Sequence, residues 1–108
     1  MIYLLGDEPI DGQLVYGAIS EMMTDDINAT ITPSWTGWAD WQQKYDLLFA
    51  SGEEFDMSYA ANWAMYAQEV SKGAFWELSD ERLAEYAPMT YEGTNDDAWK
   101  QVSVDGKV

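Results

Sequence analysis

Two adjacent carboxylates follow the first apolar run of the chain. The stretch YLLGDEP, residues 3–9, places Asp7 and Glu8 between Gly6 and Pro9. Carboxylate oxygens accept hydrogen bonds from hydroxyl groups, so a pair at the open end of a buried strand suits a polyhydroxylated ligand. The alternative is that the two acids serve the next helix, whose N-terminus carries partial positive charge. Both interpretations stay open at this point.

Residue types that bind sugars also follow two further predicted strands. They are Trp35 and Trp38 after the second strand, and Asn62 and Trp63 after the third. An indole face stacks on the apolar C–H face of a sugar, and an amide both donates and accepts hydrogen bonds. Ordinary packing is the alternative for each Trp. Helical spacing or an apolar neighbourhood explains Trp41 and Trp76, which we assign to packing.

Catalysis and metal binding find little support. Glycosidases use a pair of carboxyl groups, but residues adjacent in sequence seldom face each other across a scissile bond, so a carboxylate-based hydrolase is the weakest hypothesis. The chain has no Cys and no His, which excludes Ser–His triads, Cys–His pairs and His-based zinc sites. Calcium-loop spacing is absent. We expect no catalytic residue and no metal site. The adjacent acids are Asp7/Glu8, Asp25/Asp26, Glu53/Glu54, Asp80/Glu81 and Asp96/Asp97.

The charge balance excludes several partners. The chain has 20 acidic and five basic side chains, which gives a formal net charge of −15 over 108 residues. Such a surface repels nucleic-acid phosphates and anionic membrane faces. With 47% hydrophobic and 15% aromatic residues, the chain is expected to fold around one small core rich in large rings.

Strands and helices are predicted to alternate. We expect strands at residues 2–5, 30–34 and 55–60, and helices at 12–25, 38–50, 62–73 and 79–87, with a last turn at 95–99. Pro33 lacks an N–H, which predicts an edge position for the second strand. This alternation indicates the α/β class with parallel strands. With the first strand central, the loops after all three strands would meet at one edge.

Local signals place the ends of the helices. Asp11, Ser79 and Asn95 are predicted N-caps, and Gly52 is predicted to end the second helix in a left-handed conformation. Trp41, Tyr45 and Leu48 should share one face of that helix. The first helix carries an apolar stripe made of Leu14, Val15, Ala18, Ile19, Met22 and Met23.

The last residues, VSVDGKV, alternate apolar and polar side chains around Asp105-Gly106, a strong hairpin signal. A hairpin needs a returning strand, and the chain stops one or two residues into it. We interpret this as a chain that ends inside a larger fold.

Four segments carry a resemblance to a known family. YLLGDEP, DINATI, QQKYDLLFASGEEFD and ANWAMYAQEVSKGAFWELSDE resemble the opening of an extracellular solute-binding protein of family 1. These are the sugar-binding lipoproteins of bacterial ABC importers, and the likeness is closest to the LipO-like branch. The alternative is a free-standing carbohydrate-binding module. A complete sheet and hairpin would favour that module, and the severed hairpin speaks against it.

The resemblance implies a fold, a function and a location. It implies a partial, type II periplasmic-binding-protein-like lobe, with parallel strands in the order 2-1-3 flanked by helices. Residues 1–108 would be the N-terminal part of lobe 1 of a two-lobe protein. That protein would capture a sugar or oligosaccharide and deliver it to a membrane permease, without cofactor or chemistry. It would be lipid-anchored at the extracellular face or periplasmic.

The resemblance also implies ligand contacts at the loops after the strands. These map onto Asp7, Glu8, Trp35, Trp38, Asn62 and Trp63. Half a cleft buries much less of a ligand than a closed site, so we expect this segment to bind sugar weakly or not at all. Uncovered sheet edges and apolar helix faces predict self-association of the segment.

Overall fold

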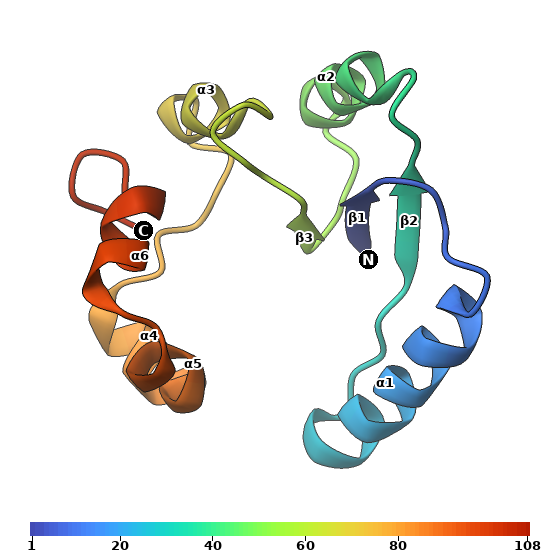
Figure 1. Cartoon of the computed structure of the whole chain (residues 1–108), viewed down its shortest axis with the longest axis horizontal. Helices are drawn as coiled ribbons and strands as arrows, with labels where there is room; N and C mark the ends of the chain where they lie inside the picture. The colour runs from blue at the N-terminus through green and yellow to red at the C-terminus, as the bar shows by residue number, and fades with distance from the viewer. The chain divides into compact units, whose positions relative to one another are not determined.

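The computed structural model describes residues 1–108, which form two compact units, Met1–Ala64 and Met65–Val108 (Figure 1). No linker or shift in composition marks this division in the sequence. The first unit holds β1 (Ile2–Leu5), α1 (Gly12–Ile27), β2 (Pro33–Thr36), α2 (Trp41–Ser51) and β3 (Met57–Ser58). The second unit is helical, with α3 (Tyr66–Ser71), α4 (Asp80–Tyr86), α5 (Pro88–Gly93) and α6 (Asp96–Val102).

The three strands form one parallel sheet in the order β2-β1-β3 (Figure 1). Ile2 is the register partner of both Pro33 on β2 and Met57 on β3. The α/β class and the 2-1-3 strand order are therefore confirmed. Pairing continues past the ends of β1, where the Gly6 amide donates to the Thr36 carbonyl at 2.8 Å.

Both outer strands differ in extent from the sequence prediction. β2 begins at Pro33 instead of ending one residue after it, and it is an edge strand as Pro33 requires. β3 has two residues, not the expected six. Phe55 lies outside it with its ring edge-on to Tyr3 at 5.7 Å, and the Asp56 carboxylate accepts a charged hydrogen bond from the N-terminal amine of Met1. The Asp56 amide also donates to the Met1 carbonyl at 3.1 Å, so one backbone hydrogen bond precedes the two-residue strand.

The local end signals are mostly confirmed. Gly52 ends α2 with φ 70°, Ser79 accepts from the Arg82 amide, and Asn95 accepts from the Ala98 amide at 2.9 Å. The prediction for Asp11 is wrong, because its side chain makes no capping bond. A backbone turn replaces it, in which the Gly12 amide donates to the Pro9 carbonyl at 2.9 Å.

Two helices begin later than predicted, and one was missed. α2 starts at Trp41 and α3 starts at Tyr66, so Trp38 and Asn62 lie in loops. Pro88 ends the preceding helix as expected, but it also opens α5 from a first-turn position, where its fixed φ suits a helix. None of the helices combines the length and apolar content needed to cross a lipid bilayer.

The core of the first unit lies between α2 and the sheet. Tyr45 is 1% exposed and Leu48 6% exposed, which confirms the predicted buried face of α2. The Tyr45 hydroxyl lies 3.5 Å from the Tyr3 carbonyl of β1. On α1, the Ser20 hydroxyl exchanges two hydrogen bonds of 3.1 Å with the backbone of Ile31, just before β2.

The apolar stripe of α1 is not buried. Leu14 is 74% exposed, Val15 50% and Met22 66%. The expectation of a stripe at helical spacing is met, but the described chain places no element over much of it.

The second unit is held by contacts between its ends. The Tyr66 hydroxyl donates to the Val102 carbonyl at 2.6 Å, and the Leu78 amide donates to the Val108 carbonyl at 2.6 Å. Asp105 and Gly106 both have positive φ, and Val104 pairs with Lys107 in an antiparallel bridge. The predicted Asp-Gly turn is thus present, with a single bridge instead of paired strands.

Candidate functional site

The loops after β1, β2 and β3 meet at the C-terminal edge of the sheet. Asp7 lies against the loop after β2, since a Cβ on Gly37 would come within 3.2 Å of its carboxylate. The Trp38 Nε1 approaches the loop after β1 in the same way, at 3.9 Å from a Cβ placed on Gly6. Trp38 in turn stacks on Trp63 of the loop after β3. The convergence of three loops expected from the parallel topology is therefore present.

Four rings form a cluster at this edge, which we call the indole cluster: Trp38, Trp41, Tyr59 and Trp63. Trp63 is its hub, with Trp41 edge-on at 5.8 Å and 90° and Tyr59 tilted at 6.0 Å and 47°. Trp38 remains 58% exposed and Trp63 53% exposed. Large rings held by one another yet half open to solvent form a preorganised surface for stacking.

The geometry of the central stack shows how a ligand can approach. The ring centroids of Trp38 and Trp63 are 6.2 Å apart with planes at 25°. A sugar ring between two indoles would need two successive contacts of about 3.5–4 Å, or roughly 7–8 Å in all. The pair is therefore closed to insertion, and a sugar must stack on the solvent-facing surface of an indole.

The two opening carboxylates have different surroundings. The Glu8 carboxylate accepts a hydrogen bond from the side-chain Nε2 of Gln13 at 3.1 Å and lies over Gly12, the first residue of α1. It fits the alternative role of an acid at a helix start. Asp7 is directed to Gly37, on the side of the second loop. Of the pair, Asp7 is placed to meet a ligand at the indole cluster.

Trp35 lies inside β2, not after it, and contacts α1. Its ring is edge-on to Tyr16 at 6.1 Å, and its Nε1 is buried without a hydrogen-bond partner. The strand places Trp35 beside Leu4, whereas Tyr3 on the next position contacts the rings near α2. Alternate residues of a strand point to opposite faces, so the structure does not bring Trp35 into the indole cluster.

Asn62 is exposed at the tip of a tight turn. The turn is closed by the Ala64 amide, which donates to the Ala61 carbonyl at 2.8 Å. This turn also holds Trp63 in the cluster, so Asn62 is carried at the same edge as the exposed rings.

Two cluster members were missed by sequence reasoning. Trp41 was assigned to packing, and it does contact Tyr45 of the core at 6.2 Å, but it also supports Trp63. Tyr59 follows β3 directly, but it falls inside the strand predicted at residues 55–60, so the rule that selects residues after each strand missed it. Burial, followed by the charge of nearby Tyr59, raises the pKa of the Tyr45 hydroxyl. Through Trp41, which contacts both Tyr45 and Trp63, the core of the first unit and the indole cluster are continuous.

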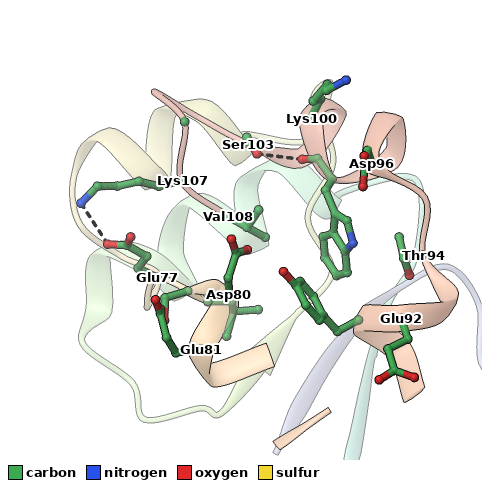
Figure 2. Close-up of a pocket in the computed structure, with 15 residues that line it drawn as sticks. Glu77, Asp80, Glu81, Glu92, Thr94, Asp96, Lys100, Ser103, Lys107 and Val108 are labelled. Atoms are coloured by element: carbon green, nitrogen blue, oxygen red, sulfur yellow. Dashed lines mark hydrogen bonds and ion pairs between the residues drawn. The ribbon is translucent and has the colours of Figure 1, made fainter. Parts of the chain in front are cut away.

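A cavity of about 630 Å³ lies in the second unit and was not expected (Figure 2). Glu77 and Lys107 close one side of it, joined by an ion pair of 2.9 Å, with Glu92 and Thr94 across from them. Burial and the nearby carboxylates of Asp80, Asp96 and Glu81 raise the pKa of Tyr91 in its wall.

Helix starts account for most of the acids around this cavity. Asp80 and Glu81 occupy the first turn of α4, and Asp96 the first turn of α6, where the helix dipole favours negative charge. No group of three or more acidic side chains is arranged to hold a metal ion. The cavity thus offers acids that already have a structural role, and the indole cluster remains the candidate site.

Comparisons with known proteins bear on the fold and the class of protein. No family model matches the sequence. The chain is 27% identical over 79 residues to a carbohydrate ABC transporter substrate-binding protein of Streptococcus pneumoniae serotype 4 (strain ATCC BAA-334 / TIGR4). That alignment covers 73% of this chain and 16% of the relative.

Solved structures give the same answer for the fold. The N-glycan transport solute binding protein NgtS from Streptococcus pneumoniae superposes with a TM-score of 0.86 at 24% identity, over 99% of this chain and 23% of that one. The chain has the fold of part of a carbohydrate solute-binding protein. NgtS in complex with Man5GlcNAc superposes with a TM-score of 0.84, again at 24% identity and over 99% and 23% of the two chains.

The resemblance read from the sequence is therefore confirmed, both by the curated relative and by the solute-binding fold. These proteins are named as binding components of transport, not as enzymes. The chain spans less than a quarter of the length of each.

Proposed function

We propose that this chain supplies part of the ligand-binding lobe of a bacterial ABC importer's substrate-binding component. Its role there is to capture a sugar or oligosaccharide. The observation that carries this proposal is the meeting of three loops at one sheet edge, where Trp38 stacks on Trp63 beside Asp7. Exposed indole faces next to a carboxylate match the apolar face and hydroxyl rim of a sugar.

We infer the wider biological role from the relatives. Residues 1–108 correspond to the N-terminal part of lobe 1, and the complete protein delivers its ligand to a membrane permease. It acts at the extracellular face of the membrane, held by a lipid anchor, or in the periplasm. It carries out no chemistry and uses no cofactor. The name of the curated relative and the oligosaccharide complex of NgtS support this assignment.

Binding by this chain alone is expected to be weak. Closed sites bury about 70–90% of a small ligand, whereas an indole pair closed to insertion offers one face. We expect a Kd on the order of 1 mM or weaker.

Residue-resolved NMR tests the proposal at this affinity. The six Trp side chains give six indole N–H signals in a proton–nitrogen correlation spectrum. Titration with Man5GlcNAc is expected to shift the Trp38 and Trp63 signals and to leave those of Trp76 and Trp99, in the second unit, unchanged. Sorbitol, which has hydroxyl groups but no ring face, is the control and should shift neither. Equal shifts at all six indoles, or none at Trp38 and Trp63, would contradict the proposal.

We also propose that the isolated chain associates with itself through α1. Leu14 and Met22 lie on one face and are 74% and 66% exposed, and exposed apolar patches recruit partners. Light scattering should show a mass that rises with concentration above the 12.3 kDa of one chain. The double variant Leu14→Gln/Met22→Gln should stay near the monomer mass.

The matched control for association is Met89→Gln. Met89 is 88% exposed on α5, outside the α1 stripe, so its replacement should leave association intact. A wild-type chain that is monomeric at every concentration would refute self-association, and loss of association in the Met89 variant would refute the role of α1.

A further inference from the structure

We infer that this site selects its glycan by charge: it accepts uncharged sugars, favours those that carry a free amine, and discriminates against those that carry a carboxylate. The inference rests on the proposed function and adds the chemical class of the ligand to it. Two observations carry it: both cations in the first unit are paired with carboxylates, and Asp7 lies at the indole cluster.

Both cations of the first unit are already paired with carboxylates. Lys44 is the single basic side chain in Met1–Ala64, and its ammonium is paired with the Asp40 carboxylate at 3.0 Å, one helical turn away. The other positive charge is the N-terminal amine of Met1, which pairs with Asp56. Met1 precedes β1, whereas the indole cluster lies beyond the C-terminal ends of the strands. A sugar carboxylate at the cluster would therefore find no unpaired cation within the first unit.

Negative charge, in contrast, is placed at the cluster. Asp7 lies at the loop that carries Trp38. Asp40, the residue before α2 and Trp41, is offset by its ion pair with Lys44, so Asp7 supplies the local negative charge. The whole chain carries a formal charge of −15, which adds a negative background. An anionic ligand is repelled by near and distant charges alike, while an ammonium group is attracted by both.

The rings add to this preference. Trp38 and Trp63 expose more than half of their surface, and the face of an indole carries negative electrostatic potential. A cation over such a face is attracted, most strongly over Trp. An amino sugar can therefore stack, place its ammonium near an indole face and bond Asp7 at the same time. A uronic acid can also stack on the indole, but its carboxylate is attracted neither by the indole face nor by Asp7.

Three matched ligands test the inference: the methyl glycosides of glucose, glucosamine and glucuronic acid. They share one pyranose ring and differ by a single charge at about pH 6, where the amine is protonated and the carboxyl is ionised. Titrations followed at the Trp38 and Trp63 indole signals are expected to give the order glucosamine, glucose, glucuronic acid. We expect the glucuronide to bind about tenfold more weakly than the glucoside at low salt.

Salt and one charge-removing variant separate electrostatics from shape. At 1 M salt the Debye length falls to about 3 Å, so the gap in affinity between the glucoside and the glucuronide should narrow. Asp7→Asn should narrow it as well. Asp25→Asn, which removes the same charge from the last turn of α1, should leave the gap nearly unchanged.

Each outcome has a clear meaning. Equal binding of glucoside and glucuronide, or a gap that salt and Asp7→Asn leave untouched, overturns charge selection while the proposed sugar binding stands. Binding of none of the three, together with none of Man5GlcNAc, removes the proposed function and this inference with it. The expected order with salt-sensitive gaps supports both.

Discussion

Trp38→Ala is expected to abolish measurable glycan binding by this chain. Trp38 is 58% exposed in the loop before α2 and supplies an open ring face at the meeting point of the three loops. Removal of a central aromatic contact costs about 2 kcal/mol or more, which is roughly a 30-fold loss of affinity. For a ligand already bound in the millimolar range, this places binding beyond detection in a titration of the Trp63 indole signal.

The fold should survive this change, because a half-exposed loop residue contributes little to the core. A loss of about 1 kcal/mol or less in the free energy of unfolding is expected. Trp38→Phe keeps an aromatic face and should retain part of the affinity. Trp76→Ala is the matched control: Trp76 is 82% exposed and lies under the Arg82 guanidinium in the second unit. Equal loss of binding in the Trp38 and Trp76 variants would remove the indole cluster from the site.

The second large effect is on stability. Tyr45→Ala is expected to lower the free energy of unfolding of the first unit by about 3–5 kcal/mol, the usual cost of truncating a buried aromatic ring. Tyr45 is 1% exposed and contacts Trp41 and Phe49 at ring-centroid distances of 6.2 and 6.3 Å. A unit of this size has little more stability than that to lose. Urea unfolding followed by near-ultraviolet circular dichroism should show the variant largely unfolded without denaturant.

Tyr45→Phe separates the ring from its hydroxyl. The hydroxyl is 3.5 Å from the Tyr3 carbonyl, a long hydrogen bond, so its loss should cost about 1 kcal/mol or less. If Tyr45→Ala has the same urea midpoint as the wild type, the Tyr45 ring does not contribute to the core of the first unit.

The wild type and Tyr45→Phe should also differ in how their stability depends on pH. Burial raises the pKa of Tyr45 above its usual 10.0, so the folded state holds the phenolic proton more tightly than the unfolded state. The resulting stability is complete below the unfolded pKa and is lost as pH rises through the folded pKa. The wild type should therefore lose stability in alkali, and Tyr45→Phe should lose less over the same range. Identical alkaline profiles would contradict this assignment.

Several features followed from the sequence alone because they depend on neighbouring residues. The Ser79 and Asn95 caps, the left-handed Gly52 and the Asp105-Gly106 turn are each formed by hydrogen bonds or dihedral preferences within a few positions. The central β1 strand and the buried face of α2 followed from apolar runs and helical spacing. The parallel topology then predicted that the three loops would meet.

Only the tertiary structure decided which side chains meet there. Trp38 and Trp63 stack across 25 positions of chain, and no local preference encodes a contact at that separation. Trp35 is excluded because β2 includes it, and its position in the strand points it to α1. Burial is also set by what lies opposite: the stripe on α1 and the face of α2 have similar spacing, yet only the latter is covered. Short-range periodicity shows that a residue can be buried, and the arrangement of the other elements determines whether it is.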